Sequence, residues 1–271
     1  MVFPKTVDAK GILNPHIAEK KFQLTRHMPS PDLAFFVEWY WIIHWDLRGQ
    51  EPHTQDVLPY PSVNLAIEES QPGVFGVITG KFTRQLVNSG RVVAAKFRPG
   101  GFYPFVQLPV SQFTGKVTAI SRVFGSQGET LERTVLATEQ DAEALAHIEQ
   151  FLRERQPQFD PNIVTINEII DCIIADRSIT RVDELVTRMS LNKRSLQRLF
   201  NQYVGISPKW VIQRYRLQDA ADQLIKNQAT DCTDMALRLG YFDLAHFIKD
   251  FKTIVGLSPA EYARRASLNP R

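Results

Sequence analysis

The sequence predicts an α+β protein of two domains, a β-rich domain over residues 1–155 and an all-α domain over residues 156–271. Three observations predict this class. Short aromatic and β-branched runs, separated by Pro and Gly, fill the first part of the chain. A helical period replaces them from about residue 139. The last third then repeats one pattern at an offset of 51 residues.

The composition is that of a globular protein. Of the 271 residues, 44% are hydrophobic and 23% charged, which is enough apolar material for two cores. Cys172 and Cys232 form no C-x-x-C pair, which indicates a reducing compartment. The sequence shows no apolar run of the length that a signal peptide or a membrane span needs. We therefore expect a cytoplasmic protein with no membrane partner.

The β pattern extends to about residue 128. Turn signals rich in Pro and Gly occur at residues 59–61, 71–73 and 98–101. Many short strands at this spacing predict a barrel or a sandwich. The expected strands cover residues 36–46, 62–68, 74–79, 83–87 and 92–97.

The segment 139–155 is the first with a helical period. It places apolar residues such as Leu145, Ile148 and Leu152 on one face. That face needs a cover, and two covers are open: the β-rich domain of the same chain, or a second copy in a homodimer. The next segment, 155–161, contains two prolines and no periodicity, and we place the domain boundary there.

The repeat in the last third implies two copies of one supersecondary unit. In the first copy Phe200, Gly205, Ser207 and Pro208 stand where the second has Phe251, Gly256, Ser258 and Pro259. Each copy contains a short helix, a turn and a second helix, preceded by Asn192 or Asp243 as N-cap. This is the helix-turn-helix arrangement, whose second helix reads DNA from its N-terminal turns.

The outward positions of the two second helices are the candidate DNA-binding residues. Arginine can read guanine and glutamine can read adenine in the major groove. In the first copy the candidates are Lys193, Arg194, Gln197 and Arg198; in the second they are Leu244, Ala245, Ile248 and Lys249. The second set is suited to contact thymine methyl groups, or to position the protein on the phosphate backbone. The buried stripes, with Leu196, Phe200, Phe247 and Phe251, are expected to be core.

The charge distribution agrees with a DNA-binding C-terminal domain. Lys and Arg balance Asp and Glu before residue 156, at 16 each, whereas 16 basic residues face 13 acidic ones after it. Between residues 193 and 216 there are six basic residues and no acidic one. Such a segment either follows the phosphate backbone or forms a solvated helix face, and both interpretations stay open.

The segment 235–262 resembles the AraC/XylS family of bacterial regulators. The glycine, Ser-Pro and aromatic spacings agree in both copies, so the resemblance covers about residues 161–266. It departs from the family pattern at Ala245, where Ser is common, and at Ala263, where Arg is usual. The resemblance implies a sequence-specific transcription regulator that reads two successive major-groove segments of double-stranded DNA. The direction of regulation, activation or repression, stays open.

The N-terminal part resembles AraC-type N-terminal domains of uncharacterised role, through residues 57–59 and 96–101. By analogy it implies a cupin-like barrel that senses an effector or dimerises. Arg98, in the turn 98–101, is the candidate ligand-binding residue for an anion, with a plain turn as the alternative. Besides DNA, the partners left open are RNA polymerase, a small-molecule effector and a second copy of the chain.

The sequence predicts no enzyme, no metal site and no cofactor. The P-loop, G-x-G-x-x-G and G-x-S-x-G signatures are absent. His44 and His53 flank one expected turn, but no H-x-H pair or nearby Glu completes a metal site. The alternative function is a binding protein without DNA, in which the β-rich domain takes a ligand and the helical domain binds protein.

Overall fold

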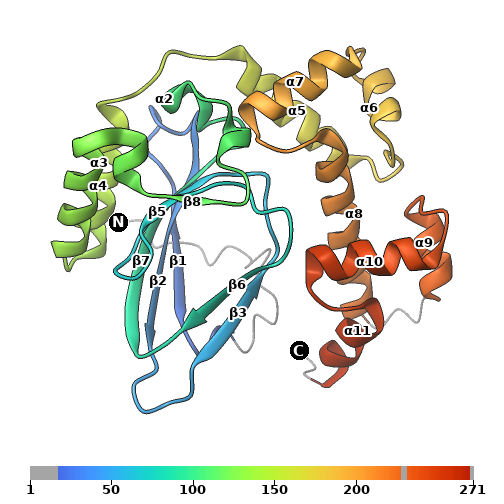
Figure 1. Ribbon diagram of the computed structural model, residues 1–271, viewed down its shortest axis with the longest axis horizontal. Helices are drawn as coiled ribbons and strands as arrows, with labels where there is room; N and C mark the ends of the chain where they lie inside the picture. The colour runs from blue at the N-terminus through green and yellow to red at the C-terminus, as the bar shows by residue number, and fades with distance from the viewer. Residues whose placement is uncertain (1–17, 227–230, 269–271) are drawn as a thin grey trace.

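The computed structural model describes residues 18–226 and 231–268. Its first part contains two antiparallel sheets (Figure 1). The larger has the order β1-β2-β7-β4-β5-β8 and the smaller pairs β3 with β6. The strands are β1 (Gln23–His27), β2 (Val37–Asp46), β3 (His53–Val57), β4 (Asn64–Ile67), β5 (Gly73–Phe75), β6 (Phe82–Leu86), β7 (Ser89–Phe97) and β8 (Val117–Thr118).

The two faces of the large sheet have different neighbours, because side chains alternate along a strand. On β2, Tyr40 and Ile42 are buried in the core that the sheet shares with helices. Trp39 and Trp41, from the same strand, line a cavity on the other face. The small sheet contributes lining residues such as Phe82 to that cavity. The first part is therefore a sandwich with helices outside it, one of the two predicted arrangements.

Helices α3 (Ile120–Ala137) and α4 (Asp141–Arg153) cover the outer face of the large sheet. Leu145, Ile148 and Leu152 of α4 are buried in the same cluster as strand residues such as Phe97. The apolar face for which two covers were open is thus covered by the chain's own sheet. Since this face of α4 is buried within the chain, it offers no surface for a dimer contact in this arrangement.

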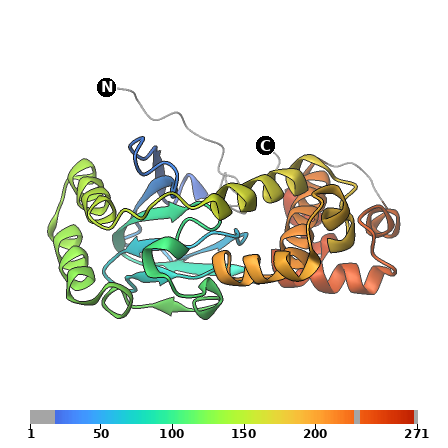
Figure 2. The same ribbon diagram turned by 90° about the horizontal axis from the view of Figure 1, so that it is seen from above.

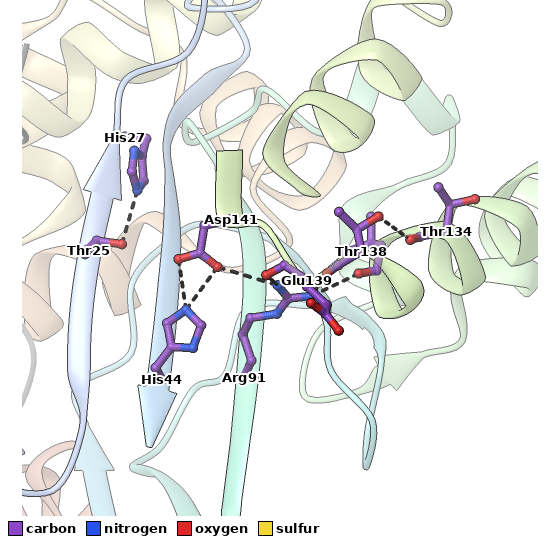
Figure 3. A network of polar contacts seen from close by, with 9 residues as sticks. Thr25, His27, His44, Arg91, Thr134, Thr138, Glu139 and Asp141 are labelled. Atoms are coloured by element: carbon purple, nitrogen blue, oxygen red, sulfur yellow. Dashed lines mark hydrogen bonds and ion pairs between the residues drawn. The ribbon is translucent and has the colours of Figure 1, made fainter. Parts of the chain in front are cut away.

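A polar network attaches the α3–α4 corner to the sheet (Figure 3). Arg91, on β7, donates hydrogen bonds to the carbonyl oxygens of Val135 and Glu139, at 3.1 and 2.9 Å. Asp141, at the start of α4, lies between Arg91 and His44, with its carboxylate 2.9 Å from His44 Nε2 and 3.5 Å from Arg91. Two adjacent strands, β2 and β7, therefore fix the position of α4.

The expected strands are confirmed at β2, β4, β6 and β7, but the extent of the β pattern was wrong. The last strand, β8, ends at Thr118, and α3 begins two residues later, not near residue 128. Two further turns of helix, α2 (Tyr103–Val106) and η1 (Val110–Gln112), precede it. The prediction failed because the aromatic residues between β7 and α3 lie partly in short helical turns, which pack against the sheet. Strands β1, β3 and β8 were not predicted.

The second part is entirely helical over the residues described (Figures 1 and 2). Helix α8 runs between an upper group, α5 to α7, and a lower group, α9 to α11 (Figure 1). No helix among residues 18–226 and 231–268 is long and apolar enough to cross a membrane. The helices are α5 (Pro161–Ala175), α6 (Val182–Arg188), α7 (Lys193–Tyr203), α8 (Pro208–Ile225), α9 (Cys232–Arg238), α10 (Leu244–Val255) and α11 (Pro259–Leu268).

Candidate nucleic-acid interface

Two helix-turn-helix units lie at the two ends of α8, α6–α7 above and α9–α10 below (Figure 1). Their turns are equivalent, since Ser190 and Gly240 both adopt the left-handed conformation, with φ of 53° and 71°. The predicted N-caps are confirmed. Asn192 accepts hydrogen bonds from the amides of Arg194 and Ser195, and Asp243 accepts one from His246.

Helix α7 separates a buried stripe from a polar, exposed one. Leu196 and Phe200 are at most 1% exposed and belong to the core of the first unit. The four predicted DNA-binding residues of this helix, Lys193, Arg194, Gln197 and Arg198, are all exposed. Lys193 contacts Asp183 of α6 at 2.6 Å, in an exposed ion pair that solvent weakens. The structure therefore brings three cations and an amide to the first turns of one helix.

Helix α10 presents fewer polar groups. Ala245 and Lys249 are exposed, as predicted. Leu244 and Ile248 are half-buried and pack against the core of the second unit. They are less buried than Phe247 and Phe251, which belong to the same cluster. They occupy the flank of the helix, where a large apolar side chain gains from covering the core.

Both second helices are anchored to the β-rich part at their C-terminal ends. Beyond α7, the Thr114 hydroxyl donates to the carbonyl oxygen of Gly205 at 2.6 Å. At α10, the backbone amide of Lys81 donates to the carbonyl oxygen of Thr253 at 3.1 Å. The exposed candidate residues lie in the opposite, N-terminal turns, which are the turns that a recognition helix inserts into a major groove.

The spacing of the two units is set by α8 and by a buried arginine. Helix α8 has 18 residues, so it is about 27 Å long at 1.5 Å per residue. From this helix, Arg216 donates to the carbonyl oxygen of Thr180 in the first unit at 3.3 Å. Its guanidinium also lies 5.5 Å from the ring centre of Tyr241 in the second unit. One side chain thus contacts both units.

The basic segment 193–216 is only partly a surface. Lys193, Arg194, Arg198 and Lys209 are exposed. Arg214 and Arg216 are 1% and 8% exposed, so these two residues fit neither the phosphate-binding nor the solvated-face interpretation. Neighbouring rings and carbonyl oxygens bury them, which sequence charge counts do not reveal.

A cavity of about 250 Å³ lies between the two sheets. Its walls are largely apolar and include Trp39 and Trp41 of β2 and Tyr60 of the loop between β3 and β4. The charged residues lining it are Arg26, Glu68, Arg84 and Lys96. The available sequence signal was the alternation of Trp39, Trp41 and Ile43, which places two tryptophans on one face of β2.

The predicted ligand residue Arg98 lies elsewhere. Its Nε donates to the carbonyl oxygen of Ala34 at 2.8 Å, and the side chain is half-buried. Gly100 follows with φ of 83°, as a tight turn requires. Among the residues described, Arg98 is not part of the cavity wall. This geometry resembles the plain-turn alternative, and Arg98 as an anion ligand stays a prediction.

Comparison with known proteins supports the helical assignment. Residues 185–265 match the model of a helix-turn-helix domain. An uncharacterised HTH-type transcriptional regulator of Haemophilus influenzae is 34% identical over 87 residues, which is 32% of this chain and 29% of that protein. The transcriptional activator RhaS of Escherichia coli is 32% identical over 79 residues, 29% of this chain and 28% of RhaS. Residues 185–265 are therefore similar to the helix-turn-helix domains of known transcriptional regulators.

The matches to these curated relatives span less than a third of their lengths. Residues 25–119 match a domain of unknown function, DUF6597. Among solved structures, ToxT of Vibrio cholerae is similar, with 10% identity and a TM-score of 0.35 over 90% of this chain and 98% of that one.

The helix-turn-helix domain also exposes an aromatic residue that the motif analysis did not single out. Phe242, just before the N-cap of α10, is 84% exposed, and the guanidinium of Arg181 lies 5.5 Å from its ring centre. Arg264 and Arg265 of α11 are exposed, as phosphate contacts need to be. Ser258 and Glu261 form a capping box at the start of α11.

Proposed function

We propose that the chain is a sequence-specific DNA-binding regulator in which α7 and α10 read two successive segments of the major groove. Residues 156–271 form the DNA-binding domain of this proposal, and residues 1–155 form a sensing domain. The observation that carries this proposal is that the two helices have the same orientation relative to the β-rich part. Their C-terminal ends are held by the β-rich part, and their N-terminal turns carry the exposed residues.

The spacing supports simultaneous reading of two segments. Equivalent faces of a duplex recur about every 34 Å, one helical turn. A connecting helix of about 27 Å, with a recognition helix attached at each end, is of the length such a span needs. The buried Arg216 restricts the relative rotation of the two units, because its guanidinium contacts both.

The two units have unequal roles in this proposal. Arg194 and Gln197 of α7 supply base readout, since Arg pairs with guanine and Gln with adenine through two hydrogen bonds each. In α10, Lys249 supplies a phosphate contact, and Ala245 offers a small apolar surface to a thymine methyl group. The first unit therefore provides most of the sequence specificity.

Regulation by a small molecule is part of the proposal. The cavity between the sheets is apolar with a few polar groups, the usual composition of a ligand site. Activation is the proposed direction, supported by the name of one relative, the transcriptional activator RhaS. In that mode RNA polymerase is the protein partner.

Selection of bound sequences from a random duplex pool tests the DNA-binding proposal. We expect an enriched motif with two elements about one helical turn apart. Arg194→Ala with Gln197→Ala should weaken the selected site by up to about 3 kcal/mol per lost base contact. Arg133→Ala, which removes one exposed charge from α3, is the matched control and should bind as the wild type does. Enrichment of no motif by the folded chain, with or without ligand, would contradict the proposal.

A further inference from the structure

The turn of the second helix-turn-helix unit is one residue longer than the turn of the first. Leu191 and Tyr241 occupy equivalent positions, because the backbone amide of each donates to the carbonyl oxygen five residues earlier, at 3.0 Å. The N-cap Asn192 follows Leu191 directly, whereas Phe242 stands between Tyr241 and the N-cap Asp243. Phe242 is therefore an inserted residue that has no counterpart in the first unit.

The core of the second unit does not use the ring of Phe242. Tyr241 is buried, and its ring centre lies 5.5 Å from that of Phe247, a contact that fixes the entry of the chain into α10. Phe242 is 84% exposed, more than any other large apolar side chain among the residues described. A ring that stays in water adds nothing to folding, so stability does not explain the insertion. Single exposed apolar residues are common, and the position of this one has to decide its role.

Phe242 lies at the end of α10 that points away from the β-rich part (Figure 1). This N-terminal end is the one that a recognition helix inserts into the major groove. The exposed Arg181 of the first unit places its guanidinium 5.5 Å from the ring centre of Phe242, and Lys249 of α10 is also exposed. Cations beside an exposed ring favour DNA as its partner, because phosphates line both edges of the groove.

The N-terminal turns of α10 offer few hydrogen-bonding groups to base edges. Ala245, His246 and Lys249 are the exposed residues there, and His246 Nε2 lies 3.2 Å from the carboxylate of Asp250. Apolar contact is therefore the main means of base readout left to this unit. In the major groove thymine presents a methyl group, against which a phenyl ring can pack.

We propose that Phe242 packs against a thymine methyl group in the major groove and makes the second unit a reader of A·T pairs. The inference rests on the proposed function and adds to it a specificity-determining residue outside the two recognition helices. Burial of one methyl group stabilises by about the transfer free energy of a methylene, which corresponds to about a fourfold change in affinity. The second unit thus selects its bases by apolar contact, and Lys249 contacts phosphate.

The test removes single methyl groups from the selected DNA site. The element under the second unit is the one whose sequence preference survives in the Arg194→Ala, Gln197→Ala variant. In that element each thymine is replaced in turn by deoxyuridine, which lacks the methyl group and pairs in the same way. Fluorescence anisotropy of labelled duplexes, titrated with the full chain at constant salt, measures Kd. We expect at least one replacement to weaken binding of the wild type about fourfold, and Phe242→Ala to bind the thymine and uracil sites equally.

Phe159→Ala removes another exposed ring, 67% exposed and outside both units, and is the matched control that should retain the preference for thymine. Three results would overturn the inference: a second element without A·T pairs, no loss of wild-type affinity at any replaced thymine, or a loss of the same size in Phe242→Ala. Each of them would leave the DNA-binding proposal intact, because a two-element motif would still have been selected. Failure of that proposal would instead appear as the absence of any enriched motif.

Discussion

Arg214 of α8 donates a hydrogen bond from its Nε to the carbonyl oxygen of Pro59, 2.7 Å away and 155 residues earlier in the chain. Its guanidinium packs on Tyr60, which lines the cavity, and on Tyr215 of its own helix. The helix that connects the two DNA-binding units is thus joined directly to the wall of the cavity.

We expect Arg214→Ala to lower the free energy of unfolding by about 2 kcal/mol or more. The truncation removes a hydrogen bond from a charged group, about 1.5–3 kcal/mol, and the packing of the arginine stem. Urea denaturation measures this change. Lys209→Ala, on the exposed side of the same helix, is the control and should change stability by no more than about 0.5 kcal/mol. Equal stability of the two variants would show that the junction does not depend on Arg214.

The buried Lys96 predicts a stability that rises with pH. Its pKa is lowered from 10.5 to about 8 in the folded chain, because burial disfavours the charged form. Between these pH values the unfolded chain binds more protons than the folded one, so the free energy of unfolding increases with pH. The increase attributable to Lys96 is at most about 3 kcal/mol.

Urea unfolding from about pH 7.5 to about pH 9 checks this, below the pKa of about 10 at which the tyrosines of the unfolded chain ionise and lower the stability. The double variant Lys96→Met, Glu38→Gln should lack the increase. Parallel curves for the variant and the wild type would show that Lys96 does not titrate in this range.

The two turn positions should respond in opposite ways to substitution. Ser190 is held at φ of 53°, which glycine adopts more readily, so Ser190→Gly should leave stability unchanged or raise it by up to about 1 kcal/mol. Gly240→Ala should lower it by about 1–3 kcal/mol. At Gly240 a new Cβ would also lie 3.1 Å from the Cβ of Thr180. Thermal unfolding compares the pair, and a stabilised Gly240→Ala would refute the equivalence of the turns.

The second unit should depend on Phe251, which is fully buried between Phe247 and Tyr262. Phe251→Ala should cost roughly 3–5 kcal/mol and abolish DNA binding. Phe242→Ala removes an aromatic ring that is 84% exposed and serves as the control, with little expected change in stability. Calorimetry of both variants measures the difference. A similar melting temperature for both would mean that Phe251 is not part of the core.

The two recognition helices should differ in what their loss does to binding. Arg194→Ala with Gln197→Ala should relax the selected sequence under the first unit. Lys249→Ala should weaken binding to all sequences alike and reduce the salt dependence by about one charge. Titrations between about 50 and 200 mM salt separate the two effects. A change of sequence preference in Lys249→Ala would assign base readout to α10.

Local patterns sufficed for the elements that follow a simple period. A second helix was predicted directly after Asn192, where α7 (Lys193–Tyr203) begins, because Asn192 caps it and Leu196 and Phe200 recur on one face. The outward position of Arg194 and Gln197 followed from the same period. Strands β1 and β3 were missed, because polar and charged residues such as Arg26 and Asp56 interrupt them. Their pairing with β2 and β6 overrides their weak local preference.

The sequence by itself determined the two helix-turn-helix units, their caps and their outward residues, since these depend on contacts within a few turns of chain. Only the tertiary structure decided that Arg214 and Arg216 are buried, that α4 lies on its own sheet, and that Lys96 faces a cavity beside Trp39 and Tyr60. These facts depend on residues far apart in sequence. Burial and charge compensation are properties of such contacts, and composition and periodicity along the chain do not encode them.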